Sequence, residues 1–138
     1  MADHGHVVEL LPSIPSAEIE ERNKWLWDVS GNKNPDVRID GYKIGDIKTP
    51  DPNIPVKQAT INRCVYTCAR QKVPLAIINL LGREYAVQDL KKGIVGALQP
   101  DRNRSIEEVW LITKAGGLFK IHRSIVFDDS IYERLKVV

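Results

Sequence analysis

The chain of 138 residues has little of what marks a membrane, secreted or disulfide-stapled protein. It has no apolar run near the roughly 18 residues that a membrane-spanning helix needs. Its start, Met-Ala-Asp-His-Gly-His, has no basic region followed by an apolar stretch, so we predict no secretory signal peptide. With 43% hydrophobic and 28% charged residues the composition is ordinary for a globular protein, and the length predicts one domain over 1–138.

Cysteine is scarce, because Cys64 and Cys68 are the only two in the chain. Two cysteines are too few for a disulfide framework, and no second Cys or His pair stands at the spacing of a zinc site. Four residues apart in a predicted helix, they share one face with other apolar residues. We therefore interpret both as buried core thiols.

No charge of one sign dominates the whole chain, whose formal net charge is +2. The charges are nevertheless unevenly spread: residues 1–56 carry six Lys/Arg against ten Asp/Glu, and residues 57–104 carry nine against three. An acidic part followed by a basic part suits a carboxylate-rich metal site beside a phosphate-binding surface.

Hydrophobic periodicity predicts an α/β fold with a mixed β-sheet flanked by helices. The apolar run 73–81 has the composition of a central strand that is covered on both sides. The segment 130–138 is either a short helix or a tail. The predicted strands are 6–11, 37–39, 42–48, 73–81, 108–113 and 118–121, and the predicted helices are 16–25, 57–71 and 84–98.

The clearest local structure is a β-hairpin around Asp40-Gly41, a pair that suits the two positive φ angles of a type I′ turn. Alternate residues of a strand share a face, so Asp46 and Lys48 project to the same side. The turn predicts a register with Asp36 beside Gly45 and diagonally near Asp46. Two carboxylates and an ammonium group then converge at one end of the hairpin.

This grouping suits Mg²⁺ (or Mn²⁺), since hard cations prefer oxygen ligands and keep several waters. A bound metal lowers the pKa of water and offsets charge on a phosphate, and Lys48 can position the water or stabilise that charge. The alternative is that Asp46 and Lys48 form an exposed ion pair worth about 0–1 kcal/mol. The combination of Pro-Asp, tight turn and D-x-K, followed by a basic helix and an apolar strand, favours the metal site.

The stretch from Asn34 to Pro50 (NPDVRIDGYKIGDIKTP) resembles the PD-(D/E)xK motif of restriction-endonuclease-like nucleases. More narrowly, it resembles the C-terminal tRNA-cleaving toxin domains of contact-dependent growth inhibition (CdiA-type) proteins. The opening segment 2–12 (ADHGHVVELLP), the helix at 58–71 and the strand at 73–81 are similar to that family as well. The resemblance covers about residues 2–125.

The resemblance implies that Asp36 and Asp46 are metal ligands and that Lys48 is the catalytic lysine. The family usually adds a glutamate from an upstream helix. Either Glu18 takes this role here, with Glu9, Glu20 and Glu21 as alternatives, or the chain lacks it. It implies a Mg²⁺-dependent endonuclease, a hydrolase acting on tRNA rather than DNA, with a cognate immunity protein as partner. Such a domain is delivered as part of a larger secreted protein and acts in the cytoplasm of a target bacterial cell.

Basic side chains around the predicted site suggest how nucleic acid would be held. The candidates for backbone contact are Arg63, Arg70, Lys72, Arg102 and Arg104. Tyr66 could stack on unpaired bases, although core packing is the commoner use of a large aromatic residue. Two alternatives stay open: a DNA-cleaving nuclease of the same fold, and a non-catalytic module that binds nucleic acid or protein.

Overall fold

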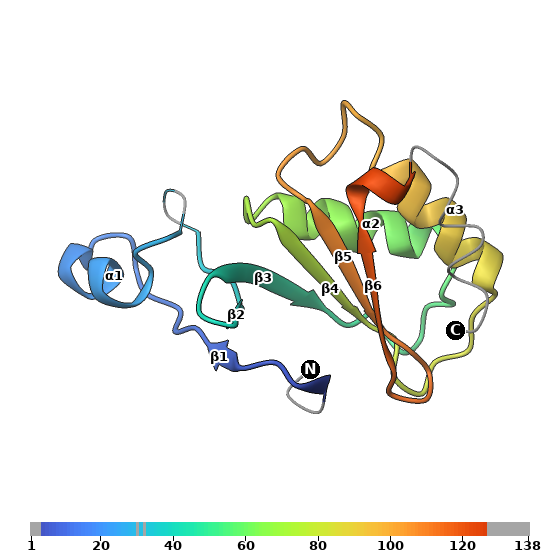
Figure 1. The fold of residues 1–138 in the computed structure, drawn as a ribbon, viewed down its shortest axis with the longest axis horizontal. Coiled ribbons are helices and arrows are strands. Elements are labelled where there is room, and N and C mark those ends of the chain that lie inside the picture. Colours follow the sequence, from blue (N-terminus) through green and yellow to red (C-terminus); the bar gives the residue numbers. More distant parts are fainter. Residues whose placement is uncertain (1–3, 30, 32, 127–138) are drawn as a thin grey trace.

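The predicted alternation of strands and helices is confirmed in the computed structural model, which describes residues 4–29, 31 and 33–126 (Figure 1). The predicted element at 130–138 lies outside these residues. No helix in the described ranges is long and apolar enough to cross a membrane. The elements are β1 Val8–Leu10, α1 Ile19–Trp25, β2 Val37–Ile39, β3 Lys43–Lys48, α2 Gln58–Ala69, β4 Leu75–Asn79, α3 Val87–Ala97, β5 Glu108–Ile112, β6 Leu118–His122 and the 3-10 helix η2 Arg123–Val126.

The six strands form one mixed sheet whose spatial order is the same as their order in the chain. β3, β4 and β5 run parallel, and β1, β2 and β6 pair antiparallel with their neighbours. α2 connects β3 to β4, and α3 connects β4 to β5. Both crossovers advance in the same direction across the sheet, so the right-handed rule for such connections puts both helices on one face.

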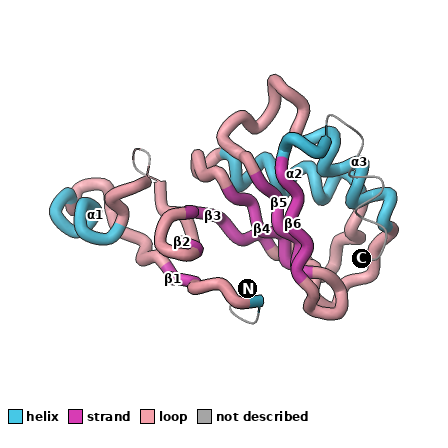
Figure 2. The backbone as a smooth tube through the Cα atoms, viewed as in Figure 1, coloured by secondary structure: helices cyan, strands magenta, loops and turns pink. Residues whose placement is uncertain are grey.

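The two faces of the sheet are therefore covered differently. α2 and α3 pack against each other and against one face, where the larger hydrophobic cluster lies (Figures 1 and 2). The opposite face carries a smaller cluster around Trp110, with the His6 ring 4.9 Å from the Trp110 ring. α1 lies beyond β1 and β2, at the far end of the molecule from α3 (Figure 1). The central strand β4 is thus buried on both sides, as predicted, but its two long neighbouring helices share one side.

The hairpin between β2 and β3 has the predicted turn residues. Asp40 and Gly41 have positive φ angles of 52° and 81°, and the Tyr42 N–H donates to the Ile39 carbonyl at 3.2 Å. β3 begins only at Lys43, so Tyr42 adds one residue to the loop beyond the two-residue turn. The register therefore differs from the predicted one.

The observed register pairs Val37, and not Asp36, with Gly45. The Asp36 N–H nevertheless donates to the Gly45 carbonyl at 3.1 Å, so Asp36 lies beside Gly45 as predicted. The two carboxylates approach each other from neighbouring strands of the hairpin.

Candidate active site

Asp36, Asp46 and Lys48 meet at the end of the hairpin, on the face of the sheet that carries α2. Asp46 is only 2% exposed, and its carboxyl lies within hydrogen-bond reach of Asp36. The Lys48 Nζ atom is 3.2 Å from Asp46 Oδ2. The Asp36 carboxylate also accepts the Ile47 N–H at 2.8 Å, which ties it to β3. The sequence-predicted triad is therefore brought together in space.

The electrostatics of the cluster are dominated by the burial of Asp46. Burial, and then the neighbouring Asp36 carboxylate, raise the pKa of Asp46 to about 6. Burial lowers the pKa of Lys48, but attraction to Asp46 outweighs it and the pKa is raised overall. Two carboxylates this close cannot both ionise at low cost unless a proton or a cation lies between them. One ammonium group only partly offsets the repulsion.

Helix α2 covers Asp46 with its two cysteine residues, which are buried as predicted. The Cys68 thiol donates to the Asp46 carbonyl across 3.6 Å. Burial raises the pKa of Cys64, and it raises the pKa of Cys68 to about 12. Both thiols therefore stay neutral at physiological pH. The two thiols form a weakly polar layer over Asp46. Charge interactions beneath such a layer are stronger because the local dielectric constant is low.

No third carboxylate joins the cluster in the part of the chain that the structure describes. Within these residues no group of three His, Cys, Asp or Glu side chains could hold a metal ion. Glu9 instead pairs with Arg38, with 2.6 Å between Oε2 and Nη1. Glu18, Glu20 and Glu21 are exposed at the start of α1. The expected glutamate is thus not placed with Asp36 and Asp46.

The loop leading to Asp36 is held by a buried arginine that sequence reasoning missed. Arg22 is 8% exposed. Its guanidinium donates to the carbonyls of Ile14 at 2.7 Å, Lys33 at 2.6 Å and Gly31 at 3.2 Å, and to Asn34 Oδ1 at 3.2 Å. These acceptors lie in two separate segments, at residue 14 and in the loop 31–34. A lone arginine in a charged helix carries no local signal of such a role.

We expect Arg22→Ala to lower the free energy of unfolding by about 1 to 2 kcal/mol, because buried carbonyls lose their donors. Lys24→Ala, which removes an exposed charge from the same helix, is the matched control. Urea denaturation of the two variants checks this. Equal stability of the two variants would show that Arg22 does not hold the loop.

The predicted phosphate-contacting residues are all exposed, and two of them share one hollow. Arg63 on α2 and Arg102 in the loop before β5 line a depression of about 560 Å³. Arg70, Lys72 and Arg104 are exposed but do not line it. The expectation of a core role for Tyr66 is wrong, since it is 53% exposed in the same hollow. Its ring lies on the outer face of α2.

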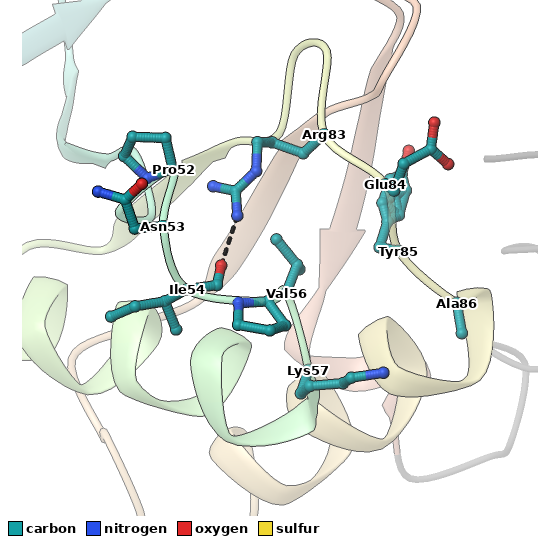
Figure 3. A pocket seen from close by; sticks show the side chains of 10 residues that line it. Pro52, Asn53, Ile54, Val56, Lys57, Arg83, Glu84, Tyr85 and Ala86 are labelled. Atoms are coloured by element: carbon teal, nitrogen blue, oxygen red, sulfur yellow. Dashed lines mark hydrogen bonds between the residues drawn. The ribbon is translucent and has the colours of Figure 1, made fainter.

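A further hollow of about 540 Å³ lies where α2 and α3 begin (Figure 3). Arg83 crosses it and donates to the carbonyls of Pro50 at 3.0 Å and Ile54 at 2.5 Å. Its guanidinium therefore holds the 50–56 loop in place. None of the three residues of the candidate active site lines this hollow.

The fold and the carboxylate–lysine cluster define an α/β domain with a compact polar site on one sheet face. The model of the family described as "Contact-dependent growth inhibition CdiA C-terminal domain" matches residues 33–118, and the chain belongs to this family of toxin domains. The matched region holds the whole cluster, from Asp36 to Lys48.

A solved structure has a similar fold. It is described as "CdiA-CT/CdiI toxin and immunity complex from Burkholderia pseudomallei". The similarity has a TM-score of 0.58 at 18% sequence identity and covers 88% of this chain and 75% of that one. At this identity the likeness shows a common fold. No curated protein sequence matches the chain.

Proposed function

We propose that the chain is the toxin domain of a contact-dependent inhibition system and acts as a metal-dependent endonuclease of the PD-(D/E)xK type. One observation carries the proposal: a nearly buried Asp46 faces Asp36 across the hairpin and pairs with Lys48. Such a cluster is costly to keep without a cation, and it suits phosphodiester hydrolysis. Its motif order along the strands supports the nuclease type.

The residues present fit a hard divalent cation such as Mg²⁺ or Mn²⁺. Asp36 and Asp46 would hold it, because two carboxylates within hydrogen-bond reach offer oxygen ligands and an unbalanced negative charge. Mg²⁺ is commonly bound by one or two carboxylates with waters and substrate phosphates, so a third protein carboxylate is not required. The metal would supply a bound water of lowered pKa and positive charge at the phosphate.

Lys48 performs the remaining chemistry from its fixed place beside Asp46. Its side chain is 32% exposed and can therefore reach a phosphate that approaches from solvent. The ion pair with Asp46 keeps the ammonium protonated and oriented. Lys48 would thus stabilise the charge that develops on the phosphate or position the attacking water.

The family and the fold support three further parts of the proposal. tRNA is favoured over DNA as substrate, on the resemblance of the motif region to the tRNA-cleaving branch. An immunity protein is proposed as partner because the similar solved structure is a toxin and immunity complex. Delivery to a target cell as part of a larger protein, followed by action in its cytoplasm, fits the family.

The test is incubation of the purified chain with total tRNA and, separately, with plasmid DNA, in Mg²⁺ and in EDTA. We expect cleavage in Mg²⁺, loss of cleavage in EDTA, and breakage of tRNA in preference to plasmid. The Asp46→Asn protein should be inactive, whereas Glu84→Gln, which removes a carboxylate exposed at 83%, should cleave like the parent. Plasmid breakage alone would assign the DNA-cleaving alternative.

A second candidate, a non-catalytic binding module of the same fold, is favoured by a specific observation. No third acidic residue lies with Asp36 and Asp46 among the described residues. Intact tRNA and plasmid in every reaction of a folded protein, together with retained binding of either polymer, would establish this candidate in place of the nuclease.

A further inference from the structure

The outer face of α2 carries a polar hollow that the proposed chemistry does not use. It has a volume of about 560 Å³ and is formed by α2 and the loop that precedes β5. Its lining residues are Gln58, Ala59, Asn62, Arg63, Tyr66 and Arg102. None of these is acidic, and α2 as a whole contains no Asp or Glu. The hollow therefore suits an anionic ligand.

The two arginines of the hollow differ from the structural arginines of this chain. The guanidinium groups of Arg22, Arg38, Arg83 and Arg123 all donate to carbonyl or carboxylate oxygens within the fold. Those of Arg63 and Arg102 make no hydrogen bond or ion pair with another described residue. With respect to the described residues their N–H donors are thus unused, and guanidinium geometry matches a phosphate group well.

Tyr66 adds a flat aromatic surface to the same hollow. Tyr66 is 53% exposed, whereas the residues on the buried face of α2 pack against the core. The side-chain amides of Gln58 and Asn62 complete the lining with neutral donors and acceptors. An exposed aromatic ring beside two arginines is a surface on which a nucleic-acid base can stack while its phosphates are bound.

The hollow adjoins a second one, although neither is lined by Asp36, Asp46 or Lys48. Arg63 and Ala59 also line a second hollow of about 350 Å³. This second hollow is bounded by Pro50 and Cys64, and the Cys64 thiol is near enough to Lys48 for the lysine charge to lower its pKa against the effect of burial. Arg63 is thus shared by the two hollows, and Cys64 connects the second one with the neighbourhood of Lys48.

The loop that carries Arg102 is fixed in advance by Arg123. The Arg123 guanidinium donates to the carbonyls of Ile106 at 2.8 Å, Asn103 at 2.6 Å and Arg102 itself at 3.1 Å. It also bonds the Leu98 carbonyl at 3.3 Å, at the end of α3. A loop ordered before binding loses little conformational entropy when a ligand arrives.

We propose that this hollow binds an unpaired nucleotide of the substrate, with the base stacked on Tyr66 and flanking phosphates held by Arg63 and Arg102. The substrate class is therefore a single-stranded or looped segment, and not an intact duplex. A base inside a duplex has both faces covered by its neighbours and cannot stack on the tyrosine. The assignment rests on the proposed function, because it identifies the substrate of that site as nucleic acid.

The test measures binding without cleavage. Fluorescence anisotropy in EDTA compares a fluorescein-labelled 12-nucleotide single-stranded RNA with the same strand annealed to its complement. We expect the parent protein to bind the single strand more tightly than the duplex. Tyr66→Ala should weaken single-strand binding roughly 5- to 150-fold and leave duplex binding within about twofold. Tyr66→Phe, which keeps the ring, should restore tight binding.

Tyr42→Ala is the matched control, because Tyr42 is a tyrosine exposed at 68% on the hairpin turn, outside the hollow. Arg102→Ala should weaken binding and reduce its dependence on salt, compared with Lys24→Ala. Single-strand binding by Tyr66→Ala equal to that of Tyr42→Ala would overturn the assignment, whatever the cleavage assay shows. If binding depends on Tyr66 but the protein cleaves neither tRNA nor plasmid, the nucleotide-binding assignment stands and the proposed nuclease activity is wrong.

Discussion

Asp46→Asn is expected to abolish cleavage while making the protein more stable in EDTA. Loss of one of two proposed metal ligands removes several kcal/mol of charge stabilisation, so the cleavage rate should fall at least about a thousandfold. The same change removes a nearly buried carboxylate that faces Asp36. A residue that serves catalysis but destabilises the fold should show two opposite effects when it is replaced, namely lower activity and higher stability.

The stability that Asp46→Asn gains over the parent protein depends on pH. The folded-state pKa of Asp46 is raised to about 6, mainly by burial, from 3.8. The protonated Asp46 carboxyl therefore stabilises the folded state fully below about pH 4. This stabilisation is lost as pH rises through 6, and the free energy of unfolding falls by about 3 kcal/mol in total. Thermal unfolding in EDTA should show the parent losing stability between pH 4 and 7 relative to Asp46→Asn.

Mg²⁺ should reduce this difference by binding the folded parent. At ten times its dissociation constant the ion stabilises the parent by about 1.4 kcal/mol, and it should stabilise Asp46→Asn far less. Unfolding midpoints at pH 7.5 with and without Mg²⁺ measure the effect. A parent protein indifferent to Mg²⁺, with Asp46→Asn no more stable than the parent in EDTA, would exclude the carboxylate pair as a cation site.

Gly93→Ala is expected to cost roughly 3 kcal/mol in the free energy of unfolding, at the upper end of typical overpacking effects. Gly93 lies at the contact between α3 and α2. A Cβ atom there would lie 2.7 Å from the Ile61 Cβ atom and 2.8 Å from the Gln58 carbonyl oxygen. Ile61 is fully buried, and the Gln58 oxygen belongs to the backbone, so neither can move aside without shifting a helix.

Gly96→Ala in the same helix is the matched control. There the nearest atom to an added Cβ is the Asn62 side-chain nitrogen at 3.3 Å, the end of a side chain that can rotate away. Alanine should stabilise this helical position by up to about 1 kcal/mol. Urea denaturation distinguishes the two substitutions. Equal unfolding free energies would mean that close approach at Gly93 does not set the distance between the helices.

Local sequence patterns were sufficient wherever neighbours in the chain decide the structure. The apolar stripe of Ile61, Cys64 and Cys68 predicted α2 and its buried face, both confirmed. Asp40-Gly41 predicted the turn because few other pairs adopt two positive φ angles. The alternation along β3 placed Asp46 and Lys48 on one face. These predictions depend on backbone geometry over a few residues.

Contacts between distant segments were decided only by the tertiary structure. Tyr42 shifted the hairpin register by one residue, which no local pattern revealed. Charge counting could not separate Arg22 and Arg123, which hold loops, from Arg63 and Arg102, which remain available to a ligand. It also could not show that Glu9 is engaged by Arg38.

The sequence by itself determined the order of the elements, the turn of the hairpin and the three polar residues of the candidate site. The tertiary structure decided which of the other charged side chains hold the fold together and which face a possible ligand. It also decided that α2 and α3 cover the same face of the sheet. The physical reason is that an arginine reaches several residues from its backbone in any direction. Its partners depend on how distant segments pack, whereas a strand or a turn is set by the dihedral angles of adjacent residues.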